Sequence, residues 1–290
     1  MIKNKIFAII TALAMTFGMT AGINAGIFPT QINITVDIRA AAESSAVKDL
    51  DMSSRQAFIN DVRKSYHINI SDRYGYLSGN TGRRHMRELN KCLSLFSPDF
   101  IKKLVAAYAE YDSRFIIRLE RPSEDDAGYA KWDGDFTIGL HYDKDPDLNG
   151  ITAGTLAHEL GHAIHFMAEE EIGERRSERE MKSFNGRFSY AGSRYERVWN
   201  ERSHGTTFAY DYAMYDYYED IACIFEMLVS DPEGMKSRLL NPRNRPLFLK
   251  TRYIRDMAYK YISDECSAVF APLPEKQAQR NVIAALNTAA

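Results

Sequence analysis

The sequence predicts an α+β fold that is mainly helical, with a small sheet placed just before one central helix. Through most of the chain, apolar residues recur at three- and four-residue spacing, which is the period of a helix face. Two neighbouring segments, 114–120 and 135–141, carry strand-like patterns instead. The 290 residues, 45% of them hydrophobic and 26% charged, are enough for one globular domain with a substantial core.

The first 25 residues have the form of a secretory signal peptide. Lys3 and Lys5 precede an apolar stretch over residues 6–21, and small residues follow up to Ala25. The apolar stretch is shorter than the roughly 18–20 residues that a spanning helix needs. We therefore expect cleavage after Ala25, or within the alanine run 40–42, and a secreted protein without stable membrane insertion. A surface protein that keeps this segment as its anchor is the alternative.

The rest of the chain divides into a linker or pro-segment over residues 26–50 and a folded domain over 51–290, in two lobes of about 51–168 and 169–290. Helix-capping and strand signals place the elements inside it. In chain order we expect helices over 53–64 and 82–111 with a break at Pro98, a strand over 114–120, a loop over 121–128, a strand over 135–141, a helix from about 150 to 168, a charged helix face and loop over 169–180, and a helix over 216–230.

Charge and cysteine content exclude two classes of protein. The chain has 37 Lys and Arg against 39 Asp and Glu, a net charge of −2, and no long basic run, so nucleic acid is not the expected partner. Its three cysteines, Cys92, Cys223 and Cys266, are too few and too scattered for a disulfide framework. We expect buried free thiols, with at most one bridge.

The motif that carries chemistry is H-E-x-x-H, at His158, Glu159 and His162, inside the predicted helix 150–168. Positions i and i+4 share one face of a helix, so both imidazoles can bind a single Zn²⁺ while the glutamate lies beside a metal-activated water. This is the chemistry of a zinc peptidase, in which the carboxylate takes the proton of the attacking water. His165 lies near the same face and is interpreted as a packing residue or as polar support.

A catalytic zinc is expected to have a third protein ligand. The metzincin pattern fails, because Ala168 stands where that pattern has its third histidine. Downstream of the motif, the residues alone leave four candidates open: His204, Asp211, Glu219 and Asp220.

The segment from Asp211 to Phe225 resembles the third-ligand segment of lethal-factor-type gluzincins, a circle that includes the secreted Pro-Pro endopeptidases. The resemblance makes Glu219 the third ligand and Tyr212, seven residues earlier, the donor to the oxyanion. Ala222 and Phe225 also match the family's pattern, whereas Cys223 stands where the family commonly has a glutamate. The resemblance therefore implies that residues 51–290 form a zincin-like endopeptidase domain that acts on protein or peptide substrates. It also implies that the strand 135–141, just before the active helix, is the edge strand that pairs with extended substrate.

Simpler interpretations remain for Glu219 and Tyr212. The sequence Asp216-Tyr-Tyr-Glu219 is also a capping-box pattern, in which Glu219 would only complete the helix N-terminus. Tyr212 stands among four other tyrosines, any of which could match by accident. At the level of function, the alternative to an enzyme is a secreted or surface binding protein that keeps a zincin fold and a structural zinc.

Overall fold

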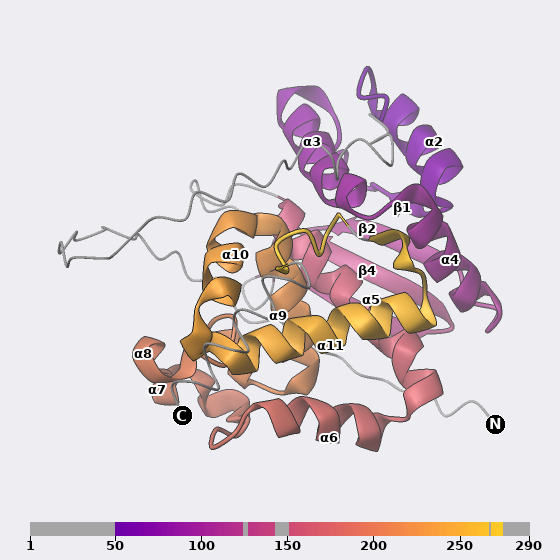
Figure 1. The fold of residues 1–290 in the computed structure, drawn as a ribbon. Coiled ribbons are helices and arrows are strands. Elements are labelled where there is room, and N and C mark those ends of the chain that lie inside the picture. The colour runs from indigo at the N-terminus through magenta and orange to yellow at the C-terminus, as the bar shows by residue number, and fades with distance from the viewer. Residues whose placement is uncertain (1–49, 124–126, 143–150, 267, 275–290) are drawn as a thin grey trace.

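The computed structural model describes residues 50–123, 127–142, 151–266 and 268–274. The predicted signal peptide and the linker lie outside these residues. Figure 1 shows the early helices grouped with the sheet on one side and the later helices on the other. The helices are α2 (Arg55–Tyr66), α3 (Gly79–Leu95), α4 (Pro98–Ala109), α5 (Ala153–Ile172), α6 (Glu174–Phe184), α7 (Tyr195–Val198), α8 (Glu201–His204), α9 (Tyr217–Ser230), α10 (Pro232–Leu240) and α11 (Arg245–Tyr261).

In the described part of the chain the sheet has four strands, in the order β1 (Asn69–Ser71), β2 (Phe115–Glu120), β4 (Asp135–His141) and β3 (Gly128–Asp133). β1, β2 and β4 run parallel, and β3 runs antiparallel to β4. The fold class is thus the expected one, a mainly helical α+β fold with a small sheet before the central helix.

The sheet differs from the expected one at two points. Residues 128–133 form a strand that the sequence analysis did not anticipate, and the segment 135–141 lies between two neighbours instead of at the edge. The side chains of β4 are buried from Phe136 to Leu140, on both faces of the sheet. The edge strand beside the central helix is β3.

The central helix α5 begins at Thr152, whose hydroxyl accepts a hydrogen bond from the Thr155 amide at 3.0 Å. It contacts α3, α4 and the sheet as well as α6, α9 and α11, so its residues from Ala153 to Glu169 are buried, with the exception of Thr155. It packs tightly against α9 at Gly161, where a Cβ atom would lie 2.9 Å from Phe225 Cδ2 and 3.1 Å from Ala222 Cα. The missing side chain lets the two helices approach closely.

Helix α9 begins where the sequence predicts. Asp216 is its N-cap, and its carboxylate accepts a hydrogen bond from the Glu219 amide at 2.9 Å. Only the backbone of Glu219 takes part in this cap contact, so its side chain remains available for another role.

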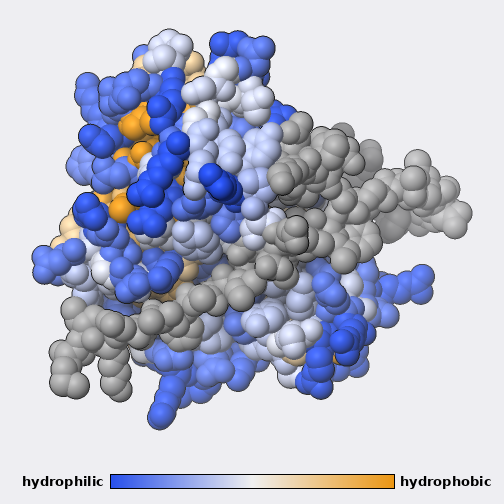
Figure 2. Space-filling model, turned by 180° about the vertical axis from the view of Figure 1, so that it is seen from behind, coloured by the Kyte–Doolittle hydropathy of each residue, from blue (hydrophilic) through white to orange (hydrophobic). Residues whose placement is uncertain are grey.

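The coloured part of the face in Figure 2 is mainly hydrophilic, and hydrophobic residues gather in one area at its upper left. Few large hydrophobic side chains are exposed among the described residues, namely Tyr74, Tyr111, Val198 and Leu240. Cys92 and Cys223 are buried free thiols, as expected. None of the described helices combines the length and apolar character needed to cross a bilayer.

Candidate metal centre

Three side chains from α5 and α9 converge on one point. His158 and His162 come from consecutive turns of α5, and Glu219 comes from the first turn of α9. Each offers one ligand atom, and these atoms lie within 4.8 Å of one another. The structure therefore brings together the three residues that the sequence analysis assigned to the metal.

Their spacing fits a metal ion. Glu219 Oε2 lies 3.1 Å from His158 Nε2 and 3.7 Å from His162 Nε2. Two ligand atoms that bind one tetrahedral zinc at about 2.1 Å are roughly 3.4 Å apart, which falls between these values.

Two of these residues, His162 and Glu219, have buried polar atoms that form no hydrogen bond within the described structure. In the part of the chain that the structure describes, both ring nitrogens of His162 and Oε1 of Glu219 are buried without a hydrogen-bond partner. Buried polar groups are normally paired, so an unpaired cluster of this composition calls for an ion. The donor set can hold a metal.

Burial and neighbouring charges move the pKa values of the two histidines in opposite directions. The pKa of His162 is lowered well below its usual value, first by burial and then by the nearby His158 and His165. Burial also lowers the pKa of His158, but hydrogen bonds with Cys223, Glu219 and Glu226 outweigh it and leave that pKa well above its usual value. Without a metal, His158 is therefore protonated and His162 is neutral at neutral pH.

Glu159 lies beside this centre and is fully buried. Its carboxylate faces the start of the edge strand, because a Cβ atom on Gly128 would lie 2.9 Å from Glu159 Oε1. The backbone of β3 thus passes directly over the glutamate that the motif assigns as the base. This contact is not predicted from the sequence, because the pattern of residues 121–128 indicates a loop.

Tyr212 lies in a short 3₁₀ turn, Asp211–Met214, just before α9. Its ring stacks on that of His158, with the centroids 6.2 Å apart and the planes at 28°. Burial, together with the charge of Glu219, raises its pKa, so the hydroxyl keeps its proton and can act as a donor. The neighbouring Tyr217 and Tyr218 donate to Glu169 instead, at 2.9 and 3.1 Å.

The other ligand candidates do not reach the centre. Asp220 forms a fully buried ion pair with Lys250, at 2.6 Å, and accepts a hydrogen bond from Tyr190 at 2.8 Å. His204 ends the short helix α8, where its Nδ1 accepts from the Asn200 amide at 2.8 Å. Asp211 accepts from the Tyr212 amide at 2.9 Å.

His165 serves as buried polar support, in line with its interpretation. Its Nε2 atom lies 2.8 Å from the Ser177 hydroxyl of α6 and 3.8 Å from Glu169 Oε1. These contacts tie α5 to α6 and lie outside the donor set of the metal centre.

The arrangement of the elements is zincin-like: a small sheet, then an H-E-x-x-H helix, then a helix that adds an acidic side chain. No known family matches the sequence, and no curated protein matches it. Among solved structures, the chain is similar to the crystal structure of a "putative zinc-binding metallo-peptidase from Bacteroides caccae". The sequences are 16% identical, the similarity covers 74% of this chain and 88% of the other, and the TM-score is 0.41. A likeness this low carries no argument about activity.

Proposed function

We propose that this protein is a secreted zinc metallopeptidase of the gluzincin type that cleaves within peptide chains. The observation that supports the proposal best is the convergence of His158, His162 and Glu219 on one point, with Glu159 beside them. Two neutral nitrogens, one carboxylate oxygen and a place for water form the donor set of a catalytic zinc site. A purely structural site would not require the adjacent glutamate.

Each residue then has a defined role. When bound, zinc would polarise the substrate carbonyl and lower the pKa of a water toward about 7. Glu159 takes the proton of the attacking water and returns it to the leaving amine. Tyr212 donates a hydrogen bond to the oxyanion that develops on the substrate carbonyl.

The edge strand gives the substrate a place to pair. Among the residues that the structure describes, β3 pairs with β4 alone, and its first residue, Gly128, lies over Glu159. An extended peptide can add to such an edge through main-chain hydrogen bonds. We therefore propose an endopeptidase acting on flexible, extended segments, with proline-containing linkers suggested by the family resemblance alone. Product profiling on a peptide library checks this, since release of single terminal residues only would contradict it.

The central test is Glu159→Gln. This variant should keep its zinc and its fold but lose at least about a hundredfold in peptide hydrolysis, because proton transfer by a positioned group contributes roughly 10²–10⁴. Zinc per chain is measured by elemental mass spectrometry, and hydrolysis is measured on the peptide library with and without a chelator. Glu178→Gln, an exposed glutamate on α6, is the matched control.

Two outcomes would contradict the proposal. A protein that binds no zinc would exclude the metal centre. A protein that binds zinc and hydrolyses nothing, with the Glu159→Gln variant indistinguishable from it, would favour a binding protein with a structural zinc.

Secretion is proposed from residues 1–25 of the sequence alone. The exported protein should begin at or near Gly26, which the intact mass of protein from the culture medium measures. Recovery only from membranes, with residues 1–25 still attached, would contradict secretion without touching the proposal for the active site.

A further inference from the structure

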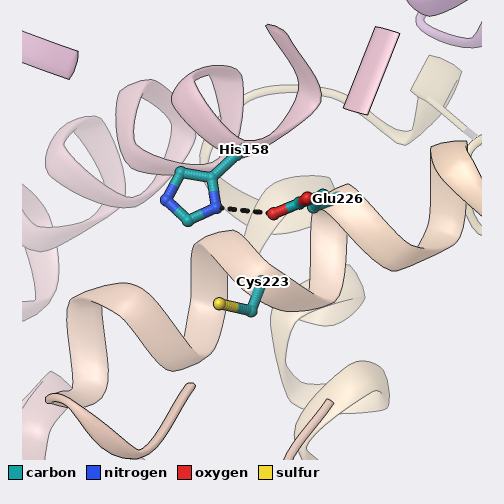
Figure 3. Close-up of side chains that lie close together, drawn as sticks. All are labelled: His158, Cys223 and Glu226. Atoms are coloured by element: carbon teal, nitrogen blue, oxygen red, sulfur yellow. Dashed lines mark hydrogen bonds and ion pairs between the residues drawn. The ribbon is translucent and has the colours of Figure 1, made fainter. Parts of the chain in front are cut away.

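The side of His158 that faces away from the metal centre has a partner of its own. Its Nδ1 atom lies 3.1 Å from Glu226 Oε2, while its Nε2 atom lies 3.1 Å from Glu219 Oε2. Figure 3 shows His158 reaching from α5 toward α9, with Glu226 in line with the ring nitrogen and Cys223 to one side. Each ring nitrogen of His158 therefore faces a different carboxylate of α9.

Glu226 is itself held in place. The hydroxyl of Tyr210 donates a hydrogen bond to the same oxygen, Oε2, that faces His158. The Glu226 side chain is 29% exposed, whereas that of His158 is only 3% exposed. The carboxylate thus lies at the border between solvent and the buried imidazole and has a fixed direction toward the ring.

The spacing along α9 explains how one helix supplies both contacts. Glu219, Cys223 and Glu226 are four and three residues apart, so they share one face of the helix. The middle position holds a fully buried thiol, which is a weak hydrogen-bond donor and acceptor. The second carboxylate on this face of α9 is therefore that of Glu226, which contacts the imidazole of His158.

We propose that Glu226, oriented by Tyr210, is a positioning residue for the metal centre. Its carboxylate accepts a hydrogen bond from the Nδ1–H group of His158, which leaves Nε2 free to bind the metal. This inference rests on the proposed zinc site. A metal-binding histidine typically donates its other ring proton to a carboxylate, which fixes the tautomer and the ring orientation and raises the basicity of the ligand nitrogen. Cys223 packs between the two carboxylates without binding the metal.

The test is the zinc affinity of the full chain, measured by competition with a chelating dye. Glu226→Ala should raise the Kd for zinc by about 10- to 100-fold, the usual effect of removing such a partner. Glu226→Gln keeps the size of the side chain and an acceptor oxygen, so its Kd should lie between those of the wild type and Glu226→Ala. Tyr210→Phe should raise the Kd less than Glu226→Ala does. Glu233→Ala, at an exposed glutamate one helix further on, should leave the Kd unchanged.

A second readout separates positioning from a general loss of stability. Visible spectra of the cobalt-substituted protein report on ligand geometry, and thermal unfolding of the metal-free forms reports on the fold. We expect Glu226→Gln to unfold at the wild-type temperature without metal and yet to show a weaker Kd and a shifted cobalt spectrum. A lower unfolding temperature with an unchanged Kd and spectrum would mean that Glu226 only supports the fold.

Two further variants distinguish the failure of this inference from the failure of the metal site. If His162→Ala binds zinc as tightly as the wild type, the proposed centre itself is wrong. If His162→Ala loses zinc while both Glu226 variants keep the wild-type Kd, only the positioning role is wrong. Cys223→Ala should change the Kd little, so loss of zinc in that variant, or a second zinc that disappears with the thiol, would overturn the assignment in favour of a metal-binding role for Cys223.

Discussion

At the scale of single residues, Gly128 shows how closely strand β3 packs against Glu159, the proposed base. A methyl group there would lie 2.9 Å from Glu159 Oε1, 2.9 Å from Gly139 O and 3.0 Å from Thr155 Cγ2, so one of these groups must move. Gly128→Ala should keep zinc but lower kcat for peptide hydrolysis by about tenfold or more, because a catalytic group displaced by 1 Å can lose about a hundredfold.

Zinc content and kcat are measured together in this variant. Gly154→Ala is the control, since a methyl group at that position of α5 meets its nearest neighbour at 3.4 Å and should leave both quantities unchanged. A wild-type kcat in Gly128→Ala would mean that Glu159 is not held by the strand.

Protonation of the two histidines gives a second prediction at this scale. The raised pKa of His158 and the lowered pKa of His162 mean that, near pH 7, zinc binding must displace about one proton, the one on His158. Raising the pH removes this proton beforehand, so the apparent zinc affinity should rise with pH and fall on acidification.

Calorimetric titration with zinc in two buffers of different ionisation enthalpy counts the protons released. Proton release near zero at neutral pH, with an affinity that does not change with pH, would contradict the assignment of His158 as a ligand that is protonated before the metal binds.

Residue patterns predicted the three residues that converge at the candidate metal centre but not the residues that contact and orient the site. H-E-x-x-H is a local pattern, and Glu219 was assigned from a second local pattern by family resemblance. Glu226 and Gly128 act on residues 68 and 31 positions away in the sequence, and no local spacing signals such contacts. The burial of Lys250, the partner of Asp220, has a local signal in the sequence. It follows Leu247 by three residues, on the face of α11 that also buries Ile254.

At the scale of elements, helices were predicted better than strands. The predicted helix of about 150–168 is observed as α5, and 216–230 as α9, since long periodic stretches and the caps Thr152 and Asp216 are encoded locally. β3 was missed because its fully buried positions hold only the small residues Gly128 and Ala130, and because its pairing with β4 depends on the turn at Gly134, which has a φ of 73°.

The register of α9 leads to a prediction about two neighbouring acids. Successive residues on a helix are turned by about 100°, so Glu219 faces the histidines while Asp220 faces Lys250. Glu219→Ala should therefore lose zinc and activity together. Asp220→Ala should keep the zinc site but lose about 3–5 kcal/mol of unfolding free energy, because it leaves a buried lysine unpaired.

Metal content after dialysis and urea unfolding measure the two effects. The double variant Asp220→Asn, Lys250→Met should recover part of the lost stability, since replacing a whole buried ion pair costs far less than breaking it. Full zinc in Glu219→Ala, with loss of zinc in Asp220→Ala, would reverse the register.

At the scale of the whole molecule, the metal centre joins the two halves of the chain. His158 and His162 belong to the helix that also covers the sheet, while Glu219 belongs to the later helices. Across this boundary the structure shows a histidine–carboxylate contact and a glycine-mediated helix crossing at Gly161. A metal bound there would link α5 to α9 through two ligands on α5 and one on α9, and these two helices pack most extensively of all the described elements.

Removing the metal should therefore lower the stability of the entire domain. A ligand that binds only the folded state stabilises it by about 2.7 kcal/mol when its free concentration is 100 times its Kd. Thermal unfolding should shift upward with zinc in a concentration-dependent way and downward with chelator, as a single transition because α5 contacts both halves. His162→Ala should abolish the shift. A zinc-independent unfolding temperature in the wild type, or a zinc-dependent shift that survives in His162→Ala, would show that the metal does not bind between α5 and α9.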